Sequence, residues 1–348
     1  MADPAYLAPW NRIVERNGVA RFVDIYFRGA GQVFFQNNPL TGLLFATGIA
    51  YGTIASGTLP VLWGFLIALF VASGTAILLD LDDQSIRRGL FGFNAALVGT
   101  ALPTYLQWNG ILAGYIALAA IVSVIVTLAL TRFLGTWEVA PLTAPFVITS
   151  WFATQASYGL ALLSGTSLLG PPRLPLGAPL ALAGLTPDTF FQGLFRGISQ
   201  VYFINNPFTG FIFLVALLVN SRISGSMAIL GSLVGLFTGL AFGAPGATVL
   251  QNGLYGYNSV LGAIAILTFF PLAWKSVAIA AFEAIAAAVA WAALDNFLAP
   301  PGIPVFTSAF VITTWALLLA RKDLRPLHNE RLAQTLLGTH QQGDAERR

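Results

Sequence analysis

Long stretches without a single Asp, Glu, Lys or Arg residue run through most of the chain. They cover positions 39–79, 89–131, 139–172, 223–274 and 296–320. Each is long enough for one or two passes of the ~20 residues that a membrane-spanning helix needs. Within lipid the backbone polar groups must be satisfied inside the structure, which leaves helices or closed barrels. Because the apolar runs are continuous rather than alternating, we predict helices.

The Gly and Pro residues between these runs predict six helical elements in each half of the chain. In the first half we expect helices at 20–36, 40–57, 60–79, 92–107, 111–134 and 143–160. In the second half we expect helices at 188–204, 208–222, 226–243, 256–270, 275–298 and 306–320. The pattern therefore predicts an all-α integral membrane protein.

Three motifs occur twice in the same order, which indicates an internal duplication. Residues 32–42 read QVFFQNNPLTG and residues 200–210 read QVYFINNPFTG, identical at eight of 11 positions. GLFGFN at 89–94 returns as GLYGYN at 253–258, and TAPFVITSW at 143–151 returns as TSAFVITTW at 307–315. The offset between copies is 168 residues for the first motif and 164 for the other two.

The motifs divide the chain into five parts. We expect an N-terminal segment at 1–19, a first membrane repeat at 20–164, a Gly- and Pro-rich linker at 165–187, a second repeat at 188–320 and a polar tail at 321–348. Duplicated membrane units commonly have inverted topology, with the solute site where the halves meet.

Inversion requires an odd number of crossings per half, so one element of each six has to be re-entrant. The first element of each half is our candidate, because it ends in Asn-Asn-Pro. We expect about ten transmembrane helices and two re-entrant half-helices.

Composition and charge agree with a membrane protein. Of the 348 residues, 56% are hydrophobic and 9% are charged, whereas soluble domains carry roughly a quarter charged residues. The net charge is only +3, which is not the footprint of a nucleic-acid-binding protein. The basic residues near both ends of the chain predict cytoplasmic termini. They are Arg12, Arg16, Arg21, Arg321, Lys322 and Arg325.

Chemistry-bearing residues are scarce in the predicted membrane region. The chain has no Cys, and its two histidines, His328 and His340, lie in the C-terminal tail. We therefore expect no metal site, no cofactor and no enzymatic activity. Glu283 and Asp295 flank an apolar helix and Glu138 precedes the first Thr motif. An acidic group at membrane depth is a functional candidate, although Glu283 and Asp295 have no counterpart in the first half.

The repeated Gln and Phe residues are candidates for a solute site. Gln32 lies three residues before Phe35, and Gln200 three residues before Phe203, so amide and ring share one helical face. A Gln in a membrane helix can simply form an interhelical hydrogen bond. Because the pair recurs in both halves, we favour a site.

The repeated Thr residues are the second candidate. Thr143 and Thr307 begin their predicted helices and would project toward the pseudo-symmetry axis. There they would form a polar spot in an apolar tube. The alternative is a hydroxyl that bonds only to the carbonyl of its own helix.

These motifs resemble those of the urea transporter family. The resemblance covers about residues 20–320 and three motifs in each half. It implies a homotrimer in which each protomer has its own pore between inverted halves. It also implies passive, channel-like permeation of urea, without ion coupling, across the plasma membrane, here the inner membrane of a bacterium. Besides urea, membrane lipid is the expected partner.

The resemblance also assigns roles to residues. It implies two solute-binding sites, one of Gln32, Val33 and Phe35 and one of Gln200, Val201 and Phe203. It makes Thr143 and Thr307 the central constriction. The second aromatic wall of each site aligns near Ala101 and Ala265, which are small and leave that wall unassigned.

Three alternative functions stay open. A channel for short amides shares the planar amide chemistry of urea, and an ammonia channel is a further alternative, although paired membrane histidines are expected there. A non-transporting membrane protein, whose duplication is only architectural, is the third reading.

Overall fold

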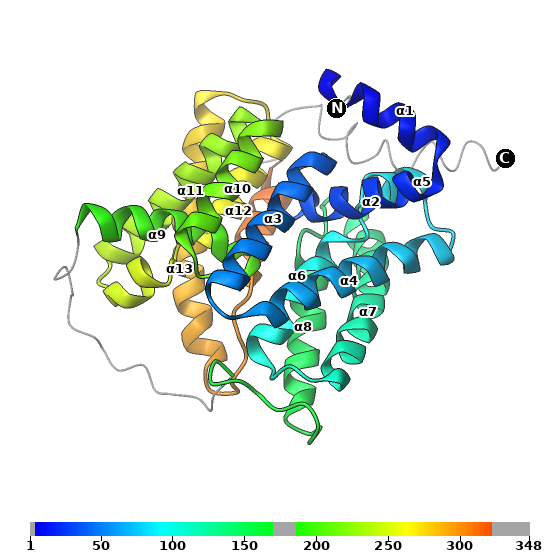
Figure 1. The fold of residues 1–348 in the computed structure, drawn as a ribbon. Coiled ribbons are helices and arrows are strands. Elements are labelled where there is room, and N and C mark those ends of the chain that lie inside the picture. Colours follow the sequence, from blue (N-terminus) through cyan, green and yellow to red (C-terminus); the bar gives the residue numbers. More distant parts are fainter. Residues whose placement is uncertain (1–3, 170–185, 322–348) are drawn as a thin grey trace.

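The computed structural model describes residues 4–169 and 186–321, and all regular elements in these ranges are helical. The first half contains η1 (Ala5–Leu7), α1 (Ala8–Arg16), α2 (Gly18–Gln32), α3 (Pro39–Ala55), α4 (Leu59–Leu78), α5 (Asp83–Arg87), α6 (Phe93–Tyr105), α7 (Gly110–Gly135) and α8 (Ala144–Ser157). The second half contains α9 (Pro187–Ser199), η2 (Gln200–Tyr202), α10 (Pro207–Asn220), α11 (Arg222–Ala241), η3 (Ala247–Gln251), α12 (Tyr257–Phe269), α13 (Trp274–Leu298) and α14 (Ser308–Ala320). Figure 1 shows this arrangement.

Each helix that the apolar pattern predicts is present, with shifted ends. The short helices α1 and α5 were not predicted from the sequence. Of the predicted linker at 165–187, residues 170–185 lie outside the described ranges, as does the predicted tail beyond Arg321.

Several helices are long and apolar enough to cross a membrane. Within the described residues these are α4, α7, α11 and α13, and a fifth if the pair of Pro187–Tyr202 and Pro207–Asn220, bent by 73°, is one broken span or a re-entrant loop. The helices α3, α12 and α14 are apolar but shorter. The protein is therefore a multi-pass helical membrane protein.

The Asn-Asn-Pro motifs form the junctions between helices. The side chain of Asn38 accepts hydrogen bonds from the N–H groups of Leu40 and Thr41, and Pro39 is the first residue of α3. Asn206 caps α10 in the same way. Such caps satisfy N–H groups that have no partner within the helix. The preceding helix α2 ends at Gln32 rather than at residue 36, because the chain turns through a left-handed conformation at Phe35, where φ is 60°.

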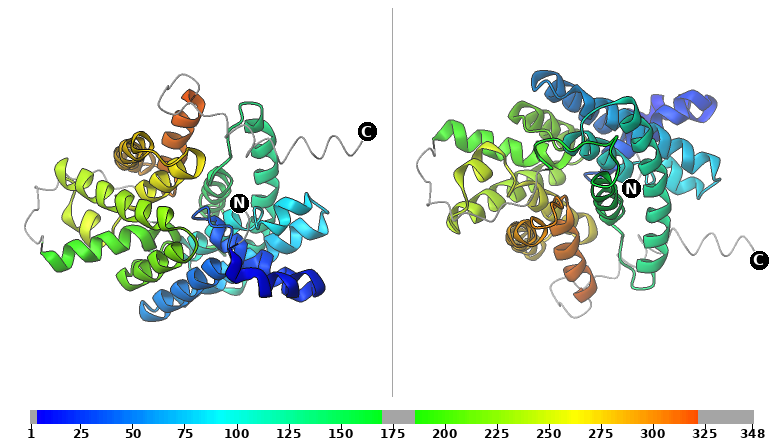
Figure 2. Two further views of the ribbon diagram at one scale, coloured as in Figure 1. Left: turned by 90° about the horizontal axis from the view of Figure 1, so that it is seen from above. Right: turned by 90° about the horizontal axis from the view of Figure 1, so that it is seen from below.

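The two halves exchange equivalent contacts. Thr41 donates to the carbonyl of Ala216 at 3.1 Å, and Thr209 donates to the carbonyl of Gly48 at 3.1 Å. Both residues of the first bond lie 168 positions from their counterparts in the second. Figure 2 shows the two halves lying side by side. Since each surface contacts its own counterpart, the interface between α3 and α10 has the character of a two-fold contact.

An aromatic cluster fills the centre of this interface. Phe34 and Phe45 come from the first half, and Tyr202 and Phe213 occupy the corresponding positions in the second. All four side chains are fully buried, and the rings of Phe45 and Phe213 lie 5.1 Å apart. Aromatic pairs of this kind contribute roughly 0.5–1.5 kcal/mol beyond their buried area. The cluster therefore fixes the halves relative to each other.

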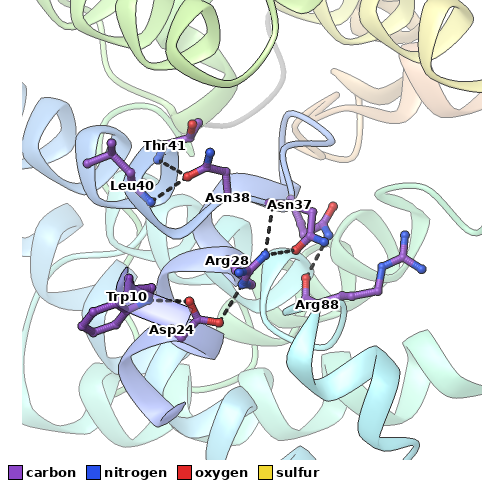
Figure 3. Close-up of polar contacts among 9 residues, drawn as sticks. Trp10, Asp24, Arg28, Asn37, Asn38, Leu40, Thr41 and Arg88 are labelled. Atoms are coloured by element: carbon purple, nitrogen blue, oxygen red, sulfur yellow. Dashed lines mark hydrogen bonds and ion pairs between the residues drawn. The ribbon is translucent and has the colours of Figure 1, made fainter. Parts of the chain in front are cut away.

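A buried ion pair supports the first junction, and residues 186–321 contain no equivalent ion pair. The Nε atom of Arg28 lies 2.6 Å from the Asp24 carboxylate, and both side chains are buried. Asp24 also accepts from the Trp10 indole at 2.7 Å, and Arg28 donates to the Asn37 side chain at 2.9 Å. Figure 3 shows this series of contacts from α1 to the Asn-Asn-Pro turn. Gln192 occupies the position equivalent to Asp24.

Replacing Asp24 by Asn should destabilise the fold strongly. The substitution keeps the size of the side chain but leaves the buried Arg28 charge without a counter-ion, which costs about 3–5 kcal/mol. The unfolding of D24N in detergent, followed by circular dichroism, measures the loss. The matched variant Q192A, at the equivalent position, should change stability by no more than about 0.5 kcal/mol. Equal stability of D24N and the unsubstituted protein would contradict a structural role for the ion pair.

Candidate functional site

Two threonine hydroxyls meet where the halves join. The Oγ1 atoms of Thr143 and Thr307 lie 2.6 Å apart, and either can donate the hydrogen bond. Each residue is the N-cap of its helix, α8 or α14. The residues before them, Leu142 and Phe306, both have positive φ values, 52° and 51°. This sharp turn directs both hydroxyls toward the same point.

Two tryptophans secure this meeting point. Trp151 of α8 donates its indole N–H to the carbonyl of Pro304 at 2.8 Å. Trp315 of α14 donates to the carbonyl of Ala140 at 3.0 Å. The bonds are reciprocal, because each helix bonds to the segment that leads into the other. Without them, two carbonyl groups would lose their partners in an apolar environment, where each unpaired group costs about 1–3 kcal/mol.

The Asn residues of the repeated Gly motif anchor the first turns of these helices. Asn94 accepts from the N–H of Phe146 at 3.1 Å, and Asn258 accepts from the N–H of Phe310 at 2.9 Å. The glycine at the start of the motif is required for space as well as for its φ of 70°, because a Cβ on Gly89 would lie 2.3 Å from the nitrogen of Gly29. The motif therefore has a structural role next to the site.

The repeated Gln residues occupy equivalent positions. The amide nitrogen of Gln32 donates to the carbonyl of Arg88 at 2.8 Å, and that of Gln200 donates to the carbonyl of Asn252 at 2.8 Å. Both side chains are partly exposed. With the amide nitrogen held this way, Oε1 remains as an acceptor for a donor-rich solute.

The valines that follow these Gln residues are buried, whereas the Gln side chains are partly exposed. The side chains of Val33 and Val201 are buried in the hydrophobic core. Their role in a solute site remains a prediction.

The structure identifies aromatic neighbours of Phe35 that the sequence left unassigned. Its ring lies 5.9 Å from that of Phe269 and 6.3 Å from that of Phe310, both in the second half. We call these three residues the first aromatic cluster. Ala265, where alignment places this wall, is fully buried one helical turn before Phe269.

The second aromatic cluster is the counterpart around Phe203. Its ring lies 6.3 Å from that of Tyr105 and 6.0 Å from that of Phe146, both in the first half. Phe306 adds a fourth ring, 5.9 Å from Phe203, where the first cluster has an aliphatic residue. Ala101 is fully buried, one turn before Tyr105. A search for aromatic residues one turn after each alanine would have found both walls.

The Gln residues, the two aromatic clusters and the two threonines can be followed from one half of the molecule to the other, and we call them the series. Phe310 lies three residues after Thr307, and Phe146 three residues after Thr143. The first turns of α14 and α8 therefore each carry a central hydroxyl and one ring of an aromatic cluster. The series runs from Gln32 and the first cluster through the two threonines to the second cluster and Gln200, and it contains no charged side chain.

Two acidic candidates from the sequence, Glu138 and Asp295, are not among the residues of this series. Glu138 forms an ion pair of 2.6 Å with Arg321, which joins the end of α14 to the segment before α8. Asp295 is exposed near the end of α13.

Comparison of the sequence with known proteins identifies its family. Residues 23–322 match the family described as Urea transporter. Over 320 residues the chain is 30% identical to urea transporter 1 of Mus musculus, and over 314 residues it is 29% identical to urea transporter 1 of Ovis aries. Each alignment covers 89% of this chain and 79% of the relative. On this evidence the chain belongs to the urea transporter family.

Proposed function

We propose that this protein facilitates the passive movement of urea across a membrane, along the series from Gln32 to Gln200. The observation that carries the proposal is the pair of hydroxyls of Thr143 and Thr307, 2.6 Å apart between two equivalent aromatic clusters. Membership of the urea transporter family supports the same solute. The chain is accordingly a transporter rather than an enzyme.

The acceptors of the series suit the chemistry of urea. Urea is planar and neutral, with four N–H bonds and one carbonyl group. Removing its hydration without replacement costs about 1–3 kcal/mol for each unsatisfied group. Oε1 of Gln32 and Gln200 and the hydroxyls of Thr143 and Thr307 can accept hydrogen bonds in turn. A solute held by neutral acceptors also leaves readily, which conduction requires.

The aromatic clusters would act as filters. Phe35 and Phe203 each face rings from the other half, nearly perpendicular to their own at 82° and 80°. These walls present aromatic carbon to a solute and offer no polar group to replace the hydration of an ion. The clusters therefore favour urea and flat amides over ions. Short amides remain the nearest alternative solutes, and neither they nor ammonia is favoured by the family match.

We also propose that the two repeats are related by a two-fold axis. The reciprocal bonds of Thr41 and Thr209 and of Trp151 and Trp315 support two repeats related by a two-fold axis. An axis in the membrane plane would give the inverted repeats, with one pore per protomer. The family resemblance and the charge pattern support the remaining features of this proposal. They are about ten crossings, two re-entrant half-helices, a homotrimer, cytoplasmic termini and a location in the inner membrane of a bacterium. The five-part division of the chain belongs to this proposal as well.

Replacing both central threonines by valine should slow urea flux while the fold is kept. Valine has the shape of threonine, and removing both partners of a hydrogen bond is nearly neutral for stability. The solute, however, would lose two acceptors, so T143V/T307V should conduct urea at least about tenfold more slowly. Stopped-flow light scattering of proteoliposomes measures the flux.

The control for this experiment is T47V. Thr47 is exposed on α3 and bonds only to the carbonyl of Leu43 in its own helix, so this variant should conduct normally. Unchanged flux in T143V/T307V would remove both hydroxyls from the mechanism.

A disulfide between the same positions should block the path. The chain has no cysteine, so T143C/T307C introduces a single thiol pair at positions whose Oγ1 atoms are 2.6 Å apart. We expect oxidation to form the disulfide and abolish urea flux, and dithiothreitol to restore it. The single variants T143C and T307C should be insensitive to oxidant. A cross-linked protein with full flux would show that the solute passes elsewhere.

A further inference from the structure

One buried acidic residue, Glu283, is not part of the proposed urea path. Glu283 is the tenth residue of the 25-residue helix α13, and it is fully buried. Its neighbours in the sequence are mostly alanines, since residues 281–288 read AFEAIAAA. A carboxyl group at this depth costs free energy unless specific contacts offset it. Its contacts therefore indicate what it does.

The carboxyl group joins three helices. Its Oε1 atom accepts hydrogen bonds from Thr313 at 2.8 Å and from Thr314 at 3.0 Å, both on α14. Its Oε2 atom has no hydrogen-bond partner within the described residues. On α12, a Cβ added to Gly262 would lie 1.5 Å from this oxygen. The missing side chain of Gly262 thus provides the space that the carboxyl group occupies.

The first half closes the equivalent junction without a carboxyl group. At an offset of 164 residues, Ala119 replaces Glu283 and Val98 replaces Gly262. The hydroxyls of the equivalent residues on α8, Thr149 and Ser150, are buried without a hydrogen-bond partner in the described structure. An apolar pair therefore fills space in one half, whereas Gly262 and Glu283 form a polar link in the other.

The linked helices carry parts of the proposed solute path. Thr307 caps α14, and Phe310 in its first turn belongs to the first aromatic cluster. The helix α12 carries Phe269, the second ring of that cluster, and Asn258, whose side chain accepts from the N–H of Phe310 in the first turn of α14. A shift of α14 against α12 would therefore change both the first aromatic cluster and the central hydroxyl pair.

We propose that Glu283 is a positioning residue that holds α14, and with it Thr307 and Phe310, in register with α12. It touches no solute and acts through the hydroxyls of Thr313 and Thr314. The effect on flux rests on the proposed urea path, but the effect on α14 does not.

Transplanting the apolar pair of the first half tests this role. E283A/G262V reproduces Ala119 and Val98, so it fills the space but removes the polar link. We expect amide exchange in 308–320 to become about tenfold faster, because α14 opens locally more often. Exchange in 144–157 should not change. Urea flux should fall severalfold, and the preference for urea over N-methylurea should weaken.

Three further variants control for loss of volume, for misfolding and for the loss of buried hydroxyls as such. E283Q keeps the size and one acceptor oxygen, so it should retain slow exchange and the preference for urea. T313V/T314V removes the two donors of α14 and leaves the carboxyl group in place against Gly262. Because the carboxyl group then lacks both hydrogen bonds, exchange in 308–320 should become at least as fast as in E283A/G262V. T149V/S150A changes the equivalent hydroxyls of α8, which have no partner, and should leave exchange and flux unchanged.

The outcomes separate this inference from the proposed function. Exchange and solute preference unchanged in both E283A/G262V and T313V/T314V would show that Glu283 only fills space. If the unsubstituted protein conducts no urea, the urea path fails. Faster exchange of α14 in the two variants would still support the positioning role.

Discussion

The reciprocal contact between α8 and α14 holds the two halves of the molecule together at the proposed constriction. In lipid, backbone carbonyls exposed before a helix starts have no water to pair with. Here the carbonyls of Ala140 and Pro304 are satisfied by indoles from the opposite half, Trp315 and Trp151. Neither half can satisfy these groups alone. The same contact brings Thr143 and Thr307 together, so the fold and the proposed constriction have one physical cause.

The two halves share this framework but differ in how they support it. The first half uses the buried ion pair of Asp24 and Arg28 at its Asn-Asn-Pro turn, whereas the second half has no acidic residue at the equivalent position. The second half instead buries Glu283 against Gly262, where the first half uses an alanine and a valine. The Gln, Phe and Thr residues of the proposed path therefore recur in both halves, whereas these two supporting contacts do not.

Much of the helical arrangement could be predicted from the sequence because apolar runs, Asn caps and Pro breaks are local signals. The Asn-Asn-Pro turns, the Gln and Phe pairs and the two threonines were found through the repeat. The second aromatic walls were not, because Tyr105 and Phe269 reach their partners only when a helix of one half packs against the other. The ion pair of Asp24 and Arg28 was also missed, although its four-residue spacing on one helix is a usable signal.

Passive conduction of urea can be distinguished from ion-coupled transport by the distribution of urea at equilibrium. Proteoliposomes with an imposed proton or sodium gradient are incubated with radiolabelled urea until uptake stops. We expect urea to enter faster than into empty liposomes and to reach equal concentrations inside and outside, whatever the gradient. Accumulation above the external concentration would show coupling to an ion, and entry no faster than into empty liposomes would show that this protein does not conduct urea.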